Sequence, residues 1–86
     1  MQVGFSKQFK KQYKKLSKGV QEKFDERVVL YMSNPAHSLL KVHKLHGALC
    51  GLYSLNVTGD VRAVFDRVSD SRIEFIAIGS HSELYS

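Results

Sequence analysis

The chain has little cysteine and little proline, with one of each, Cys50 and Pro35, among its 86 residues. A lone cysteine excludes an internal disulfide and suits a reducing compartment, and we expect it to be a small buried hydrophobic residue. No apolar run approaches the roughly 20 residues that cross a bilayer, and the start lacks the basic-then-apolar pattern of a secretory signal. The sequence therefore predicts a cytoplasmic protein with no membrane partner, folded as one small domain over residues 1–86.

Acidic residues are absent from positions 1–21, although the whole chain holds eight of them. The net charge of +5 is therefore concentrated in one N-terminal element, which carries six of the thirteen Lys and Arg residues. A clustered positive field attracts a polyanion, either a nucleic acid or an acidic protein, and a solvated lysine face is the plainer alternative. The six residues are Lys7, Lys10, Lys11, Lys14, Lys15 and Lys18.

The spacing of apolar residues predicts a short strand near residues 3–5 and then two amphipathic helices joined as an antiparallel pair. Ser6 is a suitable N-cap for the first helix, and Gly19 suits a left-handed residue just past its end. The second helix is expected to stop at Asn34, because proline disfavours helix in the residue before it. The expected core residues of the helix pair are Phe9, Tyr13, Phe24 and Val28, and those of the sheet are Phe65 and Phe75.

After Pro35 the pattern changes to a polar connection over residues 36–50 and then to three strand-like runs, 52–57, 61–68 and 72–79. The turns between these runs are short, which predicts an antiparallel meander. The predicted fold is α+β, with a strand, a two-helix hairpin and a three-stranded antiparallel meander. One face of the sheet must cover the helices, which leaves the other face for function.

The histidine at the end of the last strand, His81, suggests proton-transfer chemistry. Metal-free RNA cleavage needs one group to take the proton of the ribose 2′-OH and another to protonate the leaving 5′-oxygen, and histidine does either near neutral pH. His43 is a second candidate, and Asp60 could orient a histidine or act as a base. Arg62 suits the charge on the phosphate, and Tyr85 could stack on a base.

Each of these residues also has a plainer interpretation. His81 could be a structural histidine at a strand end, Asp60 could be simple turn chemistry, and Tyr85 could be a packed plug. Arg62 could instead form an ion pair across the sheet, with Asp66 or Glu74. A zinc site built from His43, His46 and His81 would lack the four ligands of a usual structural site, so the sequence predicts no metal and no cofactor.

Four segments carry a family pattern, and they follow one another in order along the chain. They are residues 41–45 with Gly47 and 51–53, then 59–65, then 78–81, and finally 83–85. Their order and spacing resemble the RelE/ParE superfamily of bacterial toxins, and within it the YafQ-like branch of ribosome-dependent mRNA endonucleases. The resemblance extends over essentially the whole chain and implies a RelE-like fold.

Carried over position by position, the resemblance makes His81 the general acid, with His43 and Asp60 at two further active-site positions. Arg62 falls where many relatives carry a phosphate-facing arginine, and Tyr85 takes the C-terminal aromatic position. Two lysines, Lys41 and Lys44, are expected to hold the RNA backbone. Asn56 departs from the pattern, because the YafQ-like branch has a histidine there and asparagine cannot transfer protons near pH 7.

The resemblance also implies partners, namely a cognate antitoxin protein, mRNA in the ribosomal A site and rRNA. Two alternatives stay open at this point. ParE-like relatives share the fold but inhibit DNA gyrase without nuclease chemistry, and a non-catalytic RNA-binding module could use the same basic surface. The set of histidines favours the nuclease.

Overall fold

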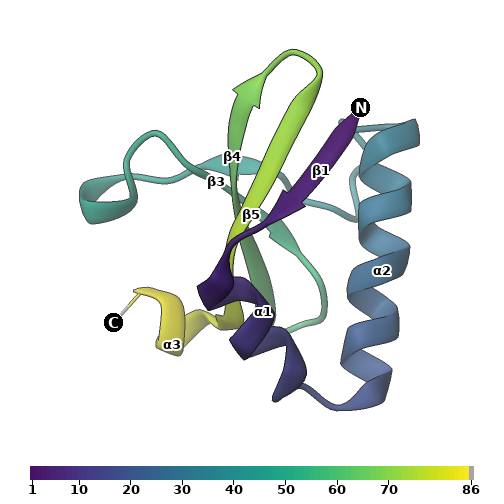
Figure 1. Ribbon diagram of the computed structural model, residues 1–86, viewed down its shortest axis with the longest axis vertical. Coiled ribbons are helices and arrows are strands. Elements are labelled where there is room, and N and C mark those ends of the chain that lie inside the picture. The colour runs from purple at the N-terminus through teal and green to yellow at the C-terminus, as the bar shows by residue number, and fades with distance from the viewer. Residues whose placement is uncertain (86) are drawn as a thin grey trace.

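The computed structural model describes residues 1–85 and places two helices, α1 and α2, beside a twisted five-stranded sheet (Figure 1). The strand order is β1-β5-β4-β3-β2, with β1 parallel to β5 and the other pairs antiparallel. The elements are β1 Gln2–Phe5, α1 Lys7–Lys14, α2 Lys18–Ser33, β2 His43–Lys44, the short 3-10 turn η1 Gly47–Leu49, β3 Tyr53–Asn56, β4 Val61–Ser69, β5 Arg72–Ser80 and α3 His81–Tyr85.

The predicted α+β fold and its antiparallel meander, β3–β4–β5, are confirmed. Three elements were not expected. The segment 36–50 contains β2 and η1, and the chain forms the helix α3 after β5. Strand β2 has only two residues, so it presents no alternation that a sequence pattern could reveal.

The boundary between the first two helices differs from the prediction. Helix α1 ends at Lys14, and Ser17 begins α2 by accepting a hydrogen bond from the amide of Val20 at 3.3 Å. Gly19 therefore lies inside the first turn of α2, and its φ is not positive; the left-handed glycines of the described chain are Gly47 and Gly51. The prediction that Gly19 ends the first helix was wrong, because the serine two residues earlier already caps the next one.

The other helix ends agree with the sequence. Ser6 caps α1 by accepting a hydrogen bond from the Phe9 amide at 3.0 Å, and α2 stops at Asn34, just before Pro35. Cys50 was expected to be buried, but it is exposed. It follows η1 on a surface segment, where Leu45, Leu49 and Leu52 are the more covered side chains. No helix within residues 1–85 is long and apolar enough to cross a membrane.

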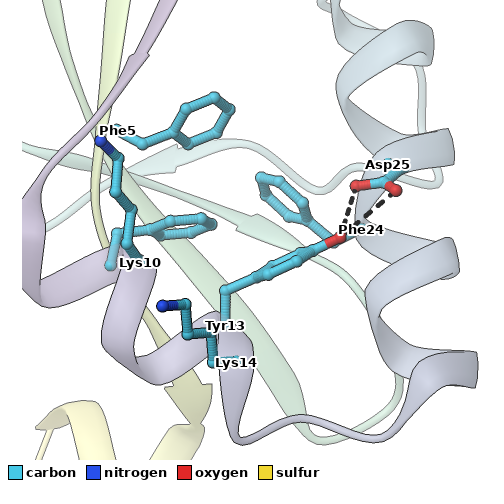
Figure 2. A pocket seen from close by; sticks show the side chains of 7 residues that line it. Phe5, Lys10, Tyr13, Lys14, Phe24 and Asp25 are labelled. Carbon is cyan, nitrogen blue, oxygen red and sulfur yellow. Dashed lines mark hydrogen bonds between the residues drawn. The ribbon is translucent and has the colours of Figure 1, made fainter.

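The core lies between α2 and the sheet and is largely aromatic. The buried ring of Phe24 lies 5.1 Å from Phe9, 5.0 Å from Phe75 and 5.9 Å from Tyr13, measured between centroids. Figure 2 shows the rings of Tyr13 and Phe24 beside a groove at the end of β1, next to the partly exposed ring of Phe5. The groove has a volume of about 490 Å³. The expected core aromatics Phe9, Phe24, Phe65 and Phe75 are all buried, and Tyr13 and Val28 pack against them.

Helix α1 completes the sheet where β1 stops. Strand β1 pairs with β5 only as far as Phe75. Beyond it, Ser6 donates its hydroxyl to the carbonyl of Ile76 at 2.8 Å, and Gln12 accepts a hydrogen bond from the amide of Ile78 at 2.9 Å. The second half of β5 is thereby held by side chains, and its end is fixed in place for α3.

Candidate functional site

The sheet register places several of the predicted residues on one face. His43 is the Cα partner of Ser54, and Asn56, Arg62 and Gly79 are partners across β3, β4 and β5. Partners in an antiparallel pair share a face, and successive residues alternate between faces. The opposite face carries the intervening residues Leu55, Ala63 and Ile78, which are buried in the core. His43, Asn56 and Arg62 therefore share the face that points away from α2.

A capping box attaches helix α3 to the end of β5. The Ser80 amide donates to the Glu83 carboxylate at 2.8 Å, and the Glu83 amide donates back to the Ser80 hydroxyl at 3.2 Å. This reciprocal pair satisfies two amides at the helix start. The hydrogen bonds from Ser80, with a smaller contribution from the charge of Lys15, lower the pKa of the Glu83 carboxyl below its usual range.

His81 and Asp60 are brought together by the backbone. The His81 amide donates to the Asp60 carbonyl at 3.1 Å, which joins the start of α3 to the turn between β3 and β4. The backbone amide of Asp60 donates to the Thr58 hydroxyl at 3.3 Å. This hydrogen bond stabilises the turn, as expected for this position. Within residues 1–85 the Asp60 carboxylate accepts no hydrogen bond, and the residue is exposed at the surface.

Gly79 allows α3 to lie close against the sheet. A Cβ atom at this position would come within 3.2 Å of the Glu83 carboxylate and 3.7 Å of the Leu84 side chain. A larger residue would push the capping box away from the strand. The family-like sequence before His81 thus has a local physical reason.

Tyr85 extends from α3 across the sheet towards β3. Its hydroxyl donates to the Ser54 hydroxyl at 3.0 Å, and its ring meets the His81 ring at 4.6 Å in an edge-to-face arrangement. Ser54 is fully buried, the one buried polar side chain in the described part of the chain. Ser54 is the Cα partner of His43, so the Tyr85 hydroxyl reaches the strand position next to His43. This geometry matches the packing interpretation of Tyr85, while base stacking stays a prediction.

Arg62 is tied to its own turn. Its Nη1 donates to the carbonyls of Thr58, Gly59 and Val61 at 3.1, 3.2 and 3.3 Å. The alternative in which Arg62 pairs with Asp66 or Glu74 was wrong, since Glu74 pairs with Arg72 at 3.5 Å and no acid of residues 1–85 pairs with Arg62. Within residues 1–85 all the side-chain hydrogen bonds of Arg62 come from Nη1, so its Nε and Nη2 donors are available.

His43 has a defined tautomer when it is neutral. Its Nδ1 lies 2.9 Å from the carbonyl oxygen of Lys41. A carbonyl only accepts hydrogen bonds, so Nδ1 carries the proton and Nε2 is left with a lone pair. Lys41 itself has a left-handed backbone, with φ of 46°. The arrangement gives His43 a free basic nitrogen on the open face.

Lys44 is separated from the other predicted residues. It is the partner of Tyr53, one position away from the His43–Ser54 pair, so its side chain lies on the opposite face. There it lines a hollow with Tyr53 and Cys50. Within residues 1–85 no group of three or more His, Cys, Asp or Glu side chains is gathered as a metal ion would require.

Three residues of this site were missed from the sequence. The capping box at Ser80 and Glu83 was readable, because Ser-x-x-Glu before an apolar pair is a helix-start pattern. Ser54 gave no signal, since nothing in a strand sequence indicates that a serine will receive a tyrosine from a distant helix. Asn56, at the position of a family histidine, is the Cα partner of Arg62. Its backbone amide donates to the Leu40 carbonyl at 2.7 Å.

The fold is that of small bacterial toxins. The crystal structure of YafQ from E. coli strain BL21(DE3) matches with a TM-score of 0.82 at 23% identity, covering 98% of this chain and 97% of that one. The toxin in the E. coli DinJ–YafQ complex matches at 0.79 and 23% identity, covering 98% and 96%. The YoeB–YefM complex from Staphylococcus aureus contains a chain that matches at 0.76 and 27% identity, covering 94% and 97%.

The sequence profile described as "Bacterial toxin of type II toxin-antitoxin system, YafQ" matches residues 1–86. No curated protein sequence gives a match. The chain therefore belongs to the YafQ family of type II toxins, as the resemblance of its motifs predicted.

Proposed function

We propose that this protein is a ribosome-dependent mRNA endonuclease that cleaves by attack of a ribose 2′-OH on the neighbouring phosphate. The observation that carries the proposal is the shared face. The His81 amide is bonded to the Asp60 carbonyl, and the His81 ring contacts the Tyr85 ring. His43 presents a free Nε2 at the strand position paired with Ser54, the residue that Tyr85 bonds. Arg62 lies on the same face with donors to spare.

In the proposed reaction the 2′-oxygen attacks phosphorus while its proton passes to Nε2 of His43. The bond from phosphorus to the 5′-oxygen breaks, and protonated His81 donates its proton to that oxygen. The products are a 2′,3′-cyclic phosphate and a free 5′-hydroxyl. Arg62 stabilises the negative charge that develops on the phosphate oxygens.

The tautomer of His43 supports it as the base ahead of Asp60. A carboxylate at the surface has a pKa near 4 and is a weak base, whereas a neutral imidazole has a pKa near 6.5 and is matched to neutral pH. Asp60 is joined to His81 through the backbone and is assigned no proton transfer in this proposal. Lys41 supplies a further cation beside His43 for the RNA backbone. The proposal leaves out Lys44, whose side chain is on the other face.

We also propose that the protein acts in the cytoplasm and is silenced there by a cognate antitoxin. The solved complexes named DinJ–YafQ and YoeB–YefM support this partner, because their toxins share this fold. The six lysines near the N-terminus would favour an acidic, partly disordered antitoxin segment.

The test is primer extension on a reporter mRNA after induction, comparing wild type with His81→Ala. We expect cuts at in-frame positions that disappear when translation is blocked, and a loss of at least about 100-fold in cleavage by His81→Ala, as removal of a general acid gives. His46→Ala is the matched control, because His46 is exposed at the start of η1 and its side chain makes no capping bond. It should cut like wild type.

Two outcomes would reject the nuclease. DNA damage without mRNA loss would indicate gyrase inhibition, the ParE-like activity. Growth inhibition that persists in full with His81→Ala, at equal expression, would indicate a binding module without catalysis.

A further inference from the structure

A cationic pocket lies beside the candidate site, at the outer edge of β3. It has a volume of about 480 Å³ and is enclosed by α2, the segment before β2 and the turn after β3. Three of its lining residues are cations, Lys23 and Arg27 from α2 and Lys41 from the opposite side, and none of its lining residues is acidic. We propose that this pocket binds a backbone phosphate of the RNA strand that enters the candidate site, an inference that rests on the proposed function.

The cations of the pocket are poorly neutralised by the protein. Lys23 pairs with Glu26 at 3.5 Å, but both side chains are largely exposed, at 46% and 69%, and such a pair contributes little. Arg27 is half-buried, and its one hydrogen bond within the described chain is a long one of 3.5 Å to the Val57 carbonyl. Like charges in a concave site focus a positive potential that favours an anion.

Lys41 connects the pocket to the candidate site. Its carbonyl holds the ring of His43, and its side chain lines the pocket. Its left-handed backbone, with φ of 46°, is unfavourable for a residue other than glycine. Strain of this kind persists where the surrounding structure requires a particular direction of the chain. Here the direction of the chain places Lys41 both next to His43 and at the pocket.

The wall of the pocket also leads towards Arg62. Asn56, Thr58 and Gly59 line the pocket, and Arg62 donates to the carbonyls of the latter two. Asn56 is moreover the partner of Arg62 on the open face. An RNA strand held at Arg62 therefore has a second cationic site next to it, around the edge of β3. The planar fork of Arg27 matches phosphate oxygens.

The test measures binding of a fluorescein-labelled, ten-nucleotide single-stranded DNA, which lacks the 2′-OH and cannot be cut. Fluorescence anisotropy between 50 and 200 mM salt gives the slope of log affinity against log salt. Each phosphate contact to a single strand contributes a slope of about −0.7. Because both cations face one phosphate, the double variant Lys23→Gln/Arg27→Gln should reduce the slope by about 0.7 and weaken binding about fivefold at 100 mM salt.

The matched control is Lys10→Gln/Lys14→Gln, which removes the same charge from α1, at the rim of the aromatic groove. It should change the slope by less than half as much. An unchanged slope in the pocket variant, an equal loss in the control, or no measurable binding by wild type at 50 mM salt would overturn the inference. So would a decaglutamate peptide that binds wild type as tightly as the oligonucleotide and loses as much affinity in the pocket variant, because the pocket would then be a site for protein carboxylates.

The two proposals fail separately. If the pocket variant loses oligonucleotide affinity as expected but wild type makes no cuts in primer extension, the phosphate site stands and the nuclease assignment falls. If cuts are made and the salt slope is unchanged in the variant, the nuclease stands and the pocket does not.

Discussion

Ser54 is a small residue on which the arrangement of the open face depends. It is buried beneath α3, and its hydroxyl is satisfied by Tyr85. A buried hydroxyl without a partner costs about 1–3 kcal/mol, so the strand retains the helix that carries His81. Tyr85 therefore holds α3 in position against β3.

Glu83 gives this helix a dependence on pH. Its pKa is lowered, chiefly by the hydrogen bond from the Ser80 amide. The ionised carboxylate therefore stabilises the folded capping box above the usual range of a glutamate, and this contribution is lost as the pH falls through the lowered pKa. We expect the Ser80 amide signal to shift in NMR spectra at acidic pH, with a midpoint below that of an exposed glutamate.

Glu83→Gln is the control for this titration. The glutamine oxygen can still accept from the Ser80 amide, so the signal should stay near its neutral-pH position throughout the acid range. A wild-type Ser80 amide that does not respond to acid would contradict the capping box.

At the scale of elements, Gly19 offers a direct check on where α2 begins. It lies in the first turn of that helix, and a Cβ added there meets nothing within 4 Å. Alanine loses less conformational entropy than glycine in a helix, so Gly19→Ala should stabilise the protein by up to about 0.5 kcal/mol. Urea unfolding measures the change. A loss of about 1 kcal/mol would instead indicate a left-handed residue at a helix end.

The elements also show what local sequence could and could not predict. The start of α1 was predictable because Ser6 caps it directly, and the end of α2 because Pro35 follows. Near Gly19 two local signals competed, a glycine that ends helices and a serine, Ser17, that begins them. Strand β2 was too short to show any periodicity. Helix α3 was not predicted, although Ser80 and Glu83 form a recognisable helix-start pattern before it.

Some features of the candidate site could likewise be predicted from the sequence, and others could not. The identity of His81, Asp60 and Arg62 came from motifs, but their meeting depends on the register of β4 against β5, which no local pattern contains. The opposite orientation of Lys44 and His43 follows from simple strand alternation, once a strand is known to be there. The tautomer of His43 depends on the nearby carbonyl of Lys41. Lys41 has a left-handed backbone, which the presence of a lysine in the sequence does not predict.

At the scale of the whole molecule, Phe24 joins the parts. Its ring contacts rings from β1, α1 and β5. Phe24→Ala should lower the free energy of unfolding by about 3–5 kcal/mol, a large share of the 5–15 kcal/mol that holds a typical domain. Chemical denaturation gives the value, and Phe24→Leu should lose clearly less. A loss below about 1 kcal/mol in the alanine variant would mean that α2 does not depend on this cluster.

The parallel pairing of β1 with β5 determines how late the sheet can be completed. It joins Gln2 to Arg72, so the strand made first waits for a partner made about 70 residues later. Pairings between distant residues slow folding, because the loop must close before the contacts form. While the chain is being synthesised, β1 cannot take its place in the sheet, and α3 has no sheet end to cap. A chain with this topology can complete its sheet only after nearly all of its residues have been made.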